Sequence, residues 1–197
     1  MMEISDRQNQ ILDAAFDVFM RYGFRKASMQ DIADAAAMSR AALYLHFRNK
    51  DDVFRSGLQR LYGQALDVLT AALDGEGGFG ERLEAALSGY AQVILAPAQL
   101  SPHGADLFAA HDSLAGELVV ENAAAFQGVL ATAIRQAETR GEIDSKRLGT
   151  TPEVLAQTLY GSLDGIKTGV KVGGDASLVA GQIGVLAKAF AGAMTAP

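Results

Sequence analysis

Apolar side chains recur along the N-terminal part of the chain at the spacing of an amphipathic helix. From Ile11 to Tyr22 they occupy positions i, i+3, i+4, i+7, i+8 and i+11, which lie on one helical face. Gly23 then provides a helix stop. Three polar residues can cap the helices that follow: Ser28, Ser39 and Asn49. The pattern therefore predicts helices over residues 11–22, 28–36, 39–47 and 49–73.

The rest of the chain continues the helical pattern, without the alternation of polar and apolar residues that is typical of a strand. Further helices are expected near residues 80–95, 103–111, 114–140, 152–170 and 176–193. The predicted fold class is all-α.

The composition is that of a globular protein. The chain has 197 residues, of which 49% are hydrophobic and 20% charged, enough to bury a core. The absence of cysteine excludes disulfides and thiolate metal sites. The first ten residues hold no apolar segment of a secretory signal, and no stretch approaches the ~20 apolar residues of a membrane span. We therefore expect a cytoplasmic protein without a membrane partner.

Charge is distributed unevenly along the chain. The net charge is −6, yet residues 1–55 carry eight basic and eight acidic side chains. Within residues 21–50 six basic residues face only Asp31 and Asp34. The basic residues are Arg21, Arg25, Lys26, Arg40, Arg48 and Lys50. This local excess indicates either a site for an acidic partner or a solvated helix face.

Two motifs that suggest a cofactor or a metal do not have the required context. The glycines of GEGGFG have the spacing of a dinucleotide-binding loop, but they follow a helical segment and not a strand. The spacing of His103, Asp106 and His111 fits no zinc signature. We expect an interhelical loop at Gly75–Gly80, no cofactor, no metal and no enzymatic activity.

Residues 28–50 predict two short helices joined by a tight turn, in the string SMQDIADAAAMSRAALYLHFRNK. Ala33 is small where the two helices must cross closely, and Met38 can fill the corner between them. These are the requirements of a helix-turn-helix, whose second helix enters the major groove of DNA. A generic helical hairpin is the alternative.

Residues 7–55 resemble the DNA-binding domain of the TetR/AcrR family of transcriptional regulators. The resemblance covers about a quarter of the chain, and its most specific part is the LYLHF run with Lys50 three residues beyond it. The chain departs from the family pattern at three positions. Ala37 stands where the turn commonly has Gly, and Ala41 and Ala42 replace a frequent Gly–Thr pair. We expect a turn geometry that tolerates a Cβ at Ala37. Ala42 lacks a hydroxyl that could touch phosphate or base, which leaves the operator sequence open but not the binding mode.

Side-chain chemistry, supported by the resemblance, assigns the contacts with DNA phosphates. Hydroxyls and backbone N–H groups at helix N-termini suit phosphate oxygens, which indicates Ser28 and Ser39. Tyr44, His46 and Lys50 resemble the phosphate clamp of the family. The alternatives for these three are a core tyrosine, a structural histidine and a surface lysine.

Four residues are candidates for reading bases. Gln30 can pair with adenine and Arg40 with guanine. Ala42 and Leu45 could contact a thymine methyl group. Contact with solvent or phosphate only is the alternative for this set.

Three glycines lie at intervals of four in the expected helix 152–170. Glycine inside a helix costs ~1 kcal/mol relative to alanine, and the close approach of another helix backbone would offset this cost. We expect helices 152–170 and 176–193 of two chains to form a four-helix bundle, as the resemblance also implies; packing within one chain is the alternative. The predicted interface residues are Leu155, Leu159, Gly161, Gly165, Gly169, Ala180, Gly184 and Ala187.

The resemblance implies a ligand cavity among the helices between about residues 51 and 140. Its candidate lining residues combine apolar bodies with a few polar groups, as small-molecule pockets require. They are Tyr62, Leu66, Tyr90, His103, Phe108, His111 and Phe126. A plain hydrophobic core is the alternative.

Together these observations predict a helix-turn-helix DNA-binding domain over residues 1–50 and an effector-binding and dimerisation domain over residues 51–197. The expected protein is a homodimeric repressor that binds a palindromic duplex operator and releases it when a small-molecule effector binds. The alternative is a helical interaction module whose basic N-terminal face docks an acidic protein.

Overall fold

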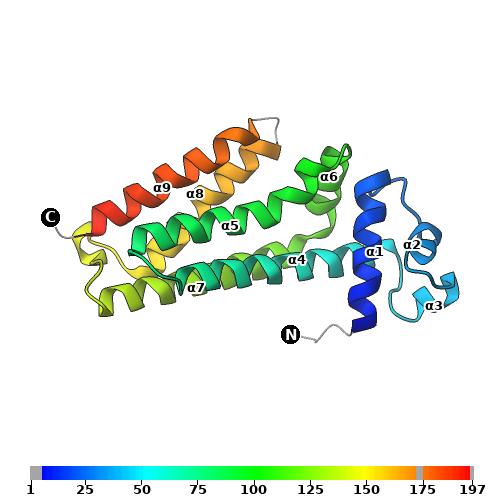
Figure 1. The fold of residues 1–197 in the computed structure, drawn as a ribbon, viewed down its shortest axis with the longest axis horizontal. Helices are drawn as coiled ribbons and strands as arrows, with labels where there is room; N and C mark the ends of the chain where they lie inside the picture. Colours follow the sequence, from blue (N-terminus) through cyan, green and yellow to red (C-terminus); the bar gives the residue numbers. More distant parts are fainter. Residues whose placement is uncertain (1–5, 172–174, 196–197) are drawn as a thin grey trace. The chain divides into compact units, whose positions relative to one another are not determined.

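The computed structural model describes residues 6–171 and 175–195, and every regular element in these ranges is helical (Figure 1). The all-α prediction is confirmed. The α-helices are α1 (Asp6–Tyr22), α2 (Met29–Ala35), α3 (Arg40–Tyr44), α4 (Lys50–Leu73), α5 (Phe79–Leu100), α6 (Gly104–Leu114), α7 (Gly116–Thr139), α8 (Pro152–Lys171) and α9 (Val179–Met194). Two short 3-10 helices are η1 (Ser145–Leu148) and η2 (Ala176–Leu178). No helix in the described ranges is long and apolar enough to cross a membrane.

Helix α3 ends at Tyr44, three residues before the predicted end. The Leu45 N–H donates to the Ala42 carbonyl (3.1 Å) and the His46 N–H donates to the Leu43 carbonyl (3.0 Å). This three-residue spacing tightens the last turn and stops the α-helical ladder. The GEGGFG segment connects α4 to α5, so it is an interhelical loop as expected.

The chain forms two compact units. Unit 1 comprises the residues up to Leu61 together with Ala96–Leu118, and unit 2 comprises Tyr62–Leu95 together with the residues from Val119 onward. The predicted domain boundary at residue 50 does not coincide with this division, since α6 packs with the N-terminal helices. The boundary between DNA-binding and effector-binding functions stays a prediction.

Three phenylalanines form the centre of unit 1. The ring centre of Phe24 lies 5.6 Å from that of Phe19 and 4.9 Å from that of Phe54. The ring centres of Phe19 and Phe54 are 5.5 Å apart. Tilted and edge-to-face aromatic pairs at these distances are favourable. The cluster joins Phe19 on α1 and Phe24 in the loop after it to Phe54 in the first turns of α4, on either side of α2 and α3 in the sequence.

The start of α6 and the residues before it cap the C-terminal end of α1 inside unit 1. Ser101 Oγ donates to the Met20 carbonyl (2.8 Å), and His103 Nε2 lies 3.1 Å from the Arg21 carbonyl oxygen. The last carbonyls of a helix have no partner within the helix, so these side chains satisfy groups that would otherwise need water.

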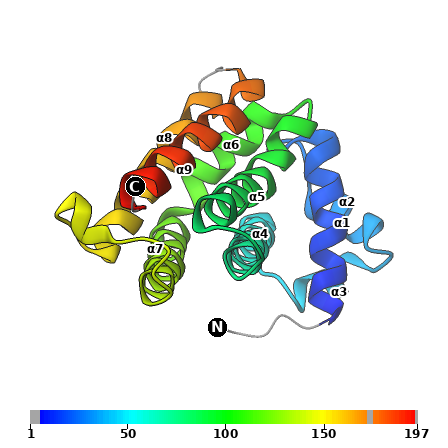
Figure 2. The same cartoon turned by 60° about the vertical axis from the view of Figure 1, so that its left-hand side comes forward.

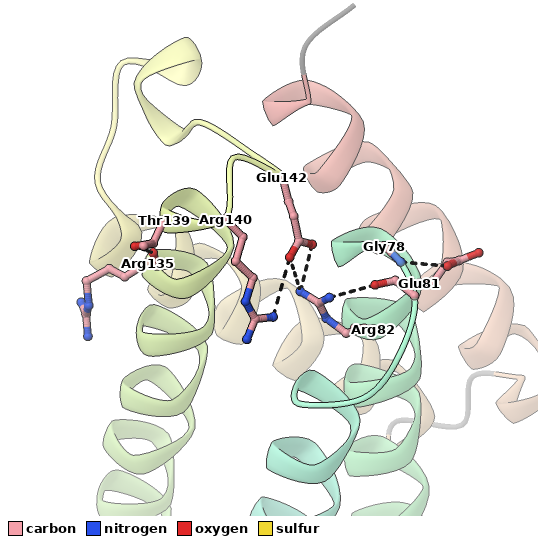
Figure 3. A network of polar contacts seen from close by, with 8 residues as sticks. Gly78, Glu81, Arg82, Arg135, Thr139, Arg140 and Glu142 are labelled. Atoms are coloured by element: carbon pink, nitrogen blue, oxygen red, sulfur yellow. Dashed lines mark hydrogen bonds and ion pairs between the residues drawn. The ribbon is translucent and has the colours of Figure 1, made fainter.

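In unit 2 a buried arginine joins two loops (Figure 3). Arg82, only 7% exposed, donates from Nη1 to the Gly77 carbonyl (2.8 Å) and from Nη2 to Glu142 (3.0 Å). A buried charge is costly unless it is paired and hydrogen-bonded, and both Nη groups meet this condition, while the buried Nε has no partner in the described part of the chain. The pair fixes the α4–α5 loop against the segment that follows α7. Helices α8 and α9 run side by side in the same unit (Figure 2).

Candidate DNA-binding interface

The start of α2 is fixed by a reciprocal capping box. Ser28 Oγ accepts from the Asp31 N–H (3.2 Å), while the Ser28 N–H donates to Asp31 Oδ2 (2.8 Å). The hydroxyl also donates to the same carboxylate (2.6 Å), and these hydrogen bonds, the side-chain one first, lower the pKa of Asp31. The hydroxyl proton and the backbone N–H of Ser28 are thus both used within the capping box, and its phosphate contact stays a prediction.

Ser39 caps α3 in a simpler way. Its Oγ accepts from the Ala42 N–H (3.1 Å), and in the described part of the chain its hydroxyl proton meets no acceptor. A phosphate oxygen is an acceptor that this proton could reach. Of the two predicted serine contacts, Ser39 is therefore the better equipped.

The turn between α2 and α3 has the backbone conformation that favours glycine. Ala37 adopts a φ of +50°, in the left-handed region, where a Cβ costs roughly 1–2 kcal/mol. The expectation that the turn geometry tolerates a Cβ is therefore wrong. The Met38 N–H donates back to the Ala33 carbonyl (3.0 Å), and this hydrogen bond helps to hold the strained turn.

Every predicted DNA contact is accessible. Ser28, Gln30, Ser39, Arg40, Tyr44 and Leu45 are exposed, and Ala42, His46 and Lys50 are partly exposed. Leu45 is 85% exposed, which is unusual for a large apolar side chain and suits a contact with a thymine methyl group.

Arg40 and Tyr44 lie one helical turn apart and touch each other. Arg40 Nη2 donates to the Tyr44 hydroxyl (3.3 Å), and its guanidinium lies 5.6 Å from the centre of the tyrosine ring. Gln30 on α2 donates to Asp34 (2.7 Å). Gln30 and Arg40, the two predicted base-reading side chains, are thus each hydrogen-bonded to a neighbour on the same helix. The hydrogen bond of Arg40 is long and therefore weak, so the guanidinium can readily replace it with hydrogen bonds to guanine.

Lys50 has a role that the sequence did not indicate. Its ammonium donates to the carbonyls of Phe24 (2.7 Å), Arg25 (3.3 Å) and Ala27 (2.9 Å), and it lies 4.4 Å from the centre of the Phe24 ring. An ammonium group has three protons, so these carbonyls use all of them. Lys50 holds the loop that leads into α2, and its direct phosphate contact stays a prediction.

Arg25, from the basic segment, is bound to α6. Its backbone N–H and its Nε both donate to Asp106, at 3.0 Å and 2.6 Å. Burial by itself would raise the pKa of Asp106, but these bonds, the charge of Arg25 and the Phe24 N–H outweigh it and lower the pKa. Asp106 and His103 therefore act in contacts between α1, its following loop and α6.

The seven predicted pocket residues are divided between the two units, and their common pocket stays a prediction. Tyr62, Leu66, Tyr90 and Phe126 belong to unit 2, whereas His103, Phe108 and His111 belong to unit 1. Tyr90 and Phe126 are both fully buried, with ring centres 4.7 Å apart. A groove of about 390 Å³ in unit 2 is lined by residues such as Glu84 and Lys188 and by none of the predicted set.

The predicted dimer residues divide into two groups. Gly161, Gly165 and Ala180 are exposed and Gly169 is partly exposed; a Cβ at any of these three glycines would meet no atom within 4 Å. Four others are covered inside the chain itself: Leu155, Leu159, Gly184 and Ala187. They pack the core of unit 2 and leave little surface for a partner. Three further apolar residues of this region are also exposed: Val154, Leu178 and Val185, at 49%, 57% and 71%.

Comparisons with known proteins place the capped helices in a family. Residues 11–56 match the family described as bacterial regulatory proteins, tetR family. The HTH-type transcriptional activator FasR of Mycolicibacterium smegmatis is 31% identical over 117 residues, which cover 59% of this chain and 47% of that protein. The HTH-type nicotine-responsive transcriptional repressor HdnoR of Paenarthrobacter nicotinovorans is 36% identical over 70 residues, 36% of each chain. The matches thus span less than half the length of these two relatives.

The fold is similar to solved structures over almost its whole length. A TetR-family transcriptional regulator from Pectobacterium atrosepticum gives a TM-score of 0.76 at 20% identity, and the match covers 96% of this chain and 95% of that one. These relatives are regulators, in agreement with the prediction that the chain is not an enzyme. Residues 11–56 therefore belong to the tetR family of bacterial regulatory proteins, and the chain as a whole shares the fold of a solved TetR-family regulator.

Proposed function

We propose that the protein is a DNA-binding transcriptional regulator that acts as a homodimer in the cytoplasm. Its affinity for a palindromic operator changes when a small molecule binds. The observation that carries the proposal is the surface of α3. The helix begins after the capping residue Ser39, exposes Arg40 and Tyr44, and is followed directly by Leu45, which is 85% exposed. A guanidinium, a phenol and an exposed apolar side chain on this short segment suit contacts in the major groove of DNA.

The name of one relative supports control by a small molecule, because HdnoR is called a nicotine-responsive repressor. The other relative, FasR, is called an activator. We favour repression here, as the simplest consequence of occupying a promoter. Release would follow if the effector changed the spacing of the two recognition helices, since a dimer must match two half-sites about one helical turn, roughly 34 Å, or a multiple apart.

The outer faces of α8 and α9 support the dimer. Exposed glycines and alanines on these faces offer a flat backbone surface, and Val154 and Val185 add apolar area beside them. In the described part of the chain no atom lies within 4 Å of a Cβ added at Gly161 or Gly165, so no close packing there offsets the helical cost of these glycines. A second copy of the same face would do so by close helix packing, which makes the interface self-complementary.

Substitution of one exposed glycine tests the dimer. Gly165→Leu should separate the packed helices and shift the mass in solution toward that of the monomer. Gly128→Leu is the matched control, because Gly128 is also a helical glycine at which an added Cβ would meet no atom within 4 Å, but it lies on α7. A dimer that survives Gly165→Leu unchanged would place the interface elsewhere.

Selection of duplexes from a random library tests the DNA-binding function itself. The proposal predicts a selected sequence with two inverted half-sites, bound by one dimer. If no sequence is enriched while an acidic protein binds the basic N-terminal face, the chain is an interaction module instead.

A further inference from the structure

The interior of unit 2 contains a polar cluster within an aromatic shell. The ring of Phe126 on α7 packs between two tyrosine rings. Its centre lies 4.7 Å from that of Tyr90 on α5 and 5.3 Å from that of Tyr160 on α8. Lys167 on α8 places its ammonium 5.6 Å from the ring centres of both tyrosines. Asn122 on α7 contacts the Tyr90 hydroxyl group, with Asn122 Nδ2 2.5 Å from the Tyr90 hydroxyl oxygen. Three helices thus bring one cation, two phenols and one amide together.

The amide of Asn122 has hydrogen-bonding capacity left over. The residue is 6% exposed, and its Oδ1 has no partner in the described part of the chain. If the amide is turned around, Oδ1 accepts from the Tyr90 hydroxyl and the two N–H donors are left over instead. In either orientation the Tyr90–Asn122 pair keeps at least one N–H or O–H donor without an acceptor among the described residues. A buried group of this kind is destabilising when it is left without a partner, so its presence calls for a compensating contact.

Lys167 adds a positive charge to these donors. Its side chain is 9% exposed, and it pairs with Asp164 (3.1 Å), whose side chain is 54% exposed. The faces of Tyr90 and Tyr160 also attract the charge. Burial raises the pKa of Tyr90, so its hydroxyl stays protonated and can donate.

We propose that this cluster binds the carboxylate of a small organic acid, with Lys167 as the counter-charge, Tyr90 and Asn122 as hydrogen-bond donors, and the aromatic rings as walls for an apolar body. The site rests on the proposed function, since its ligand would be the effector. Tyr160 is half-buried and is the aromatic residue of the shell that reaches the surface, so a ligand would enter by displacing its ring.

The experiment compares acids with the matching alcohols. The probes are 4-phenylbutyrate and octanoate, and the uncharged controls are the alcohols of the same length, each titrated into the full-length protein by calorimetry. Lys167→Met should weaken binding of the acids at least ~10-fold, the cost of about 1.4 kcal/mol of charge interaction, and leave the alcohols within about twofold. Lys188→Met is the control variant, because Lys188 is 76% exposed and lies outside the cluster.

A second measurement separates a ligand site from a structural ion pair. Without ligand, Lys167→Met should keep or raise the melting temperature, because an apolar side chain replaces a buried charge. A fall of several degrees would mean that the lysine stabilises the fold, and it would overturn the proposal. Failure of both acids to bind the unaltered protein at millimolar concentration would overturn it too, and so would equal weakening of acids and alcohols. If the protein still binds the selected duplex when one of these outcomes is found, the proposed regulator function is retained and only the proposed carboxylate site is rejected.

Discussion

Two cations of unit 1 stay exposed or partly exposed, whereas unit 2 buries two of its own. In unit 1 the Arg25 side chain is 86% exposed and binds Asp106 on α6, and the partly exposed Lys50 binds carbonyls of the loop before α2. In unit 2 Arg82 and Lys167 are each 7% exposed. The first arrangement leaves the Arg25 guanidinium accessible to solvent. The second uses positive charge to fix loops and, by our proposal, to receive a ligand.

The contrast is tested most strongly by removing one cation of each kind. Arg82→Met should lower the free energy of unfolding by ~3 kcal/mol, because Glu142 and the Gly77 carbonyl lose a buried partner. Arg60→Met in unit 1 should cost less, about 1–2 kcal/mol: the Arg60 side chain is 21% exposed and also donates to the Asn9 carbonyl (3.0 Å), but its ionic partner Asp13 is 73% exposed. Denaturant unfolding measures both. Equal losses would mean that burial does not distinguish the two units.

The contact between α1 and α6 predicts the next largest effect. Gly23 has a φ of +78°, and a Cβ there would lie 2.7 Å from Asp106 Oδ2. Gly23→Ala should therefore cost at least ~2 kcal/mol, from backbone strain and the clash together. Gly149→Ala isolates the strain, because Gly149 has a φ of +63° with no atom within 4 Å, and it should cost ~1 kcal/mol. If thermal unfolding gives the two variants the same stability, Asp106 does not press on Gly23.

Asp106 also gives this contact a pH dependence. Its pKa in the folded protein is lowered below the ordinary value of 3.8, so its stabilising contribution is present above about pH 5 and is lost as the pH falls through the folded-state pKa. Asp106→Asn should cost ~1 kcal/mol at pH 7 and should show a shallower loss of stability between about pH 6 and pH 3. Parallel pH profiles for the two proteins would contradict the assignment.

Relief of the strained turn is the smallest predicted change. Ala37→Gly should raise the free energy of unfolding by ~0.5–1 kcal/mol, because glycine adopts the left-handed conformation without the steric cost. Ala36→Gly, one residue earlier at a φ of −81°, should instead lower it. A destabilising Ala37→Gly would show that the alanine methyl group makes a contact worth more than the strain.

These features differ in how far the sequence could predict them. The caps at Ser28 and Ser39 and the short helices between them were predictable, because each signal lies within four residues of the group that it satisfies. The carbonyls held by Lys50 were not, since they lie more than twenty positions earlier in the chain. The same holds for the approach of Asn122 and Lys167 to Tyr90, which only the packing of three helices produces.

The dimer face shows how far helical periodicity alone can predict. Leu159 and Gly161 are two positions apart on α8, which is roughly 200° around a helix, so they face opposite sides. The leucine is buried in the chain and the glycine is exposed. The stripe of glycines was sufficient to predict an outward face, but the flanking leucines belong to the inward one.

The central claim is that α3 reads DNA sequence, and the affinity of Arg40→Ala for a selected duplex tests it most directly. Arg147→Ala is the control, because Arg147 is an exposed arginine on η1 in unit 2. Arg40→Ala should lose ~1–3 kcal/mol per half-site on the selected duplex, keep the affinity of the unaltered protein for scrambled DNA, and relax the preference at one base pair. Arg147→Ala should bind both duplexes like the unaltered protein. If Arg40→Ala binds the selected duplex as tightly as Arg147→Ala does, or loses both duplexes equally, α3 does not read the sequence through Arg40 and the account is wrong at its centre.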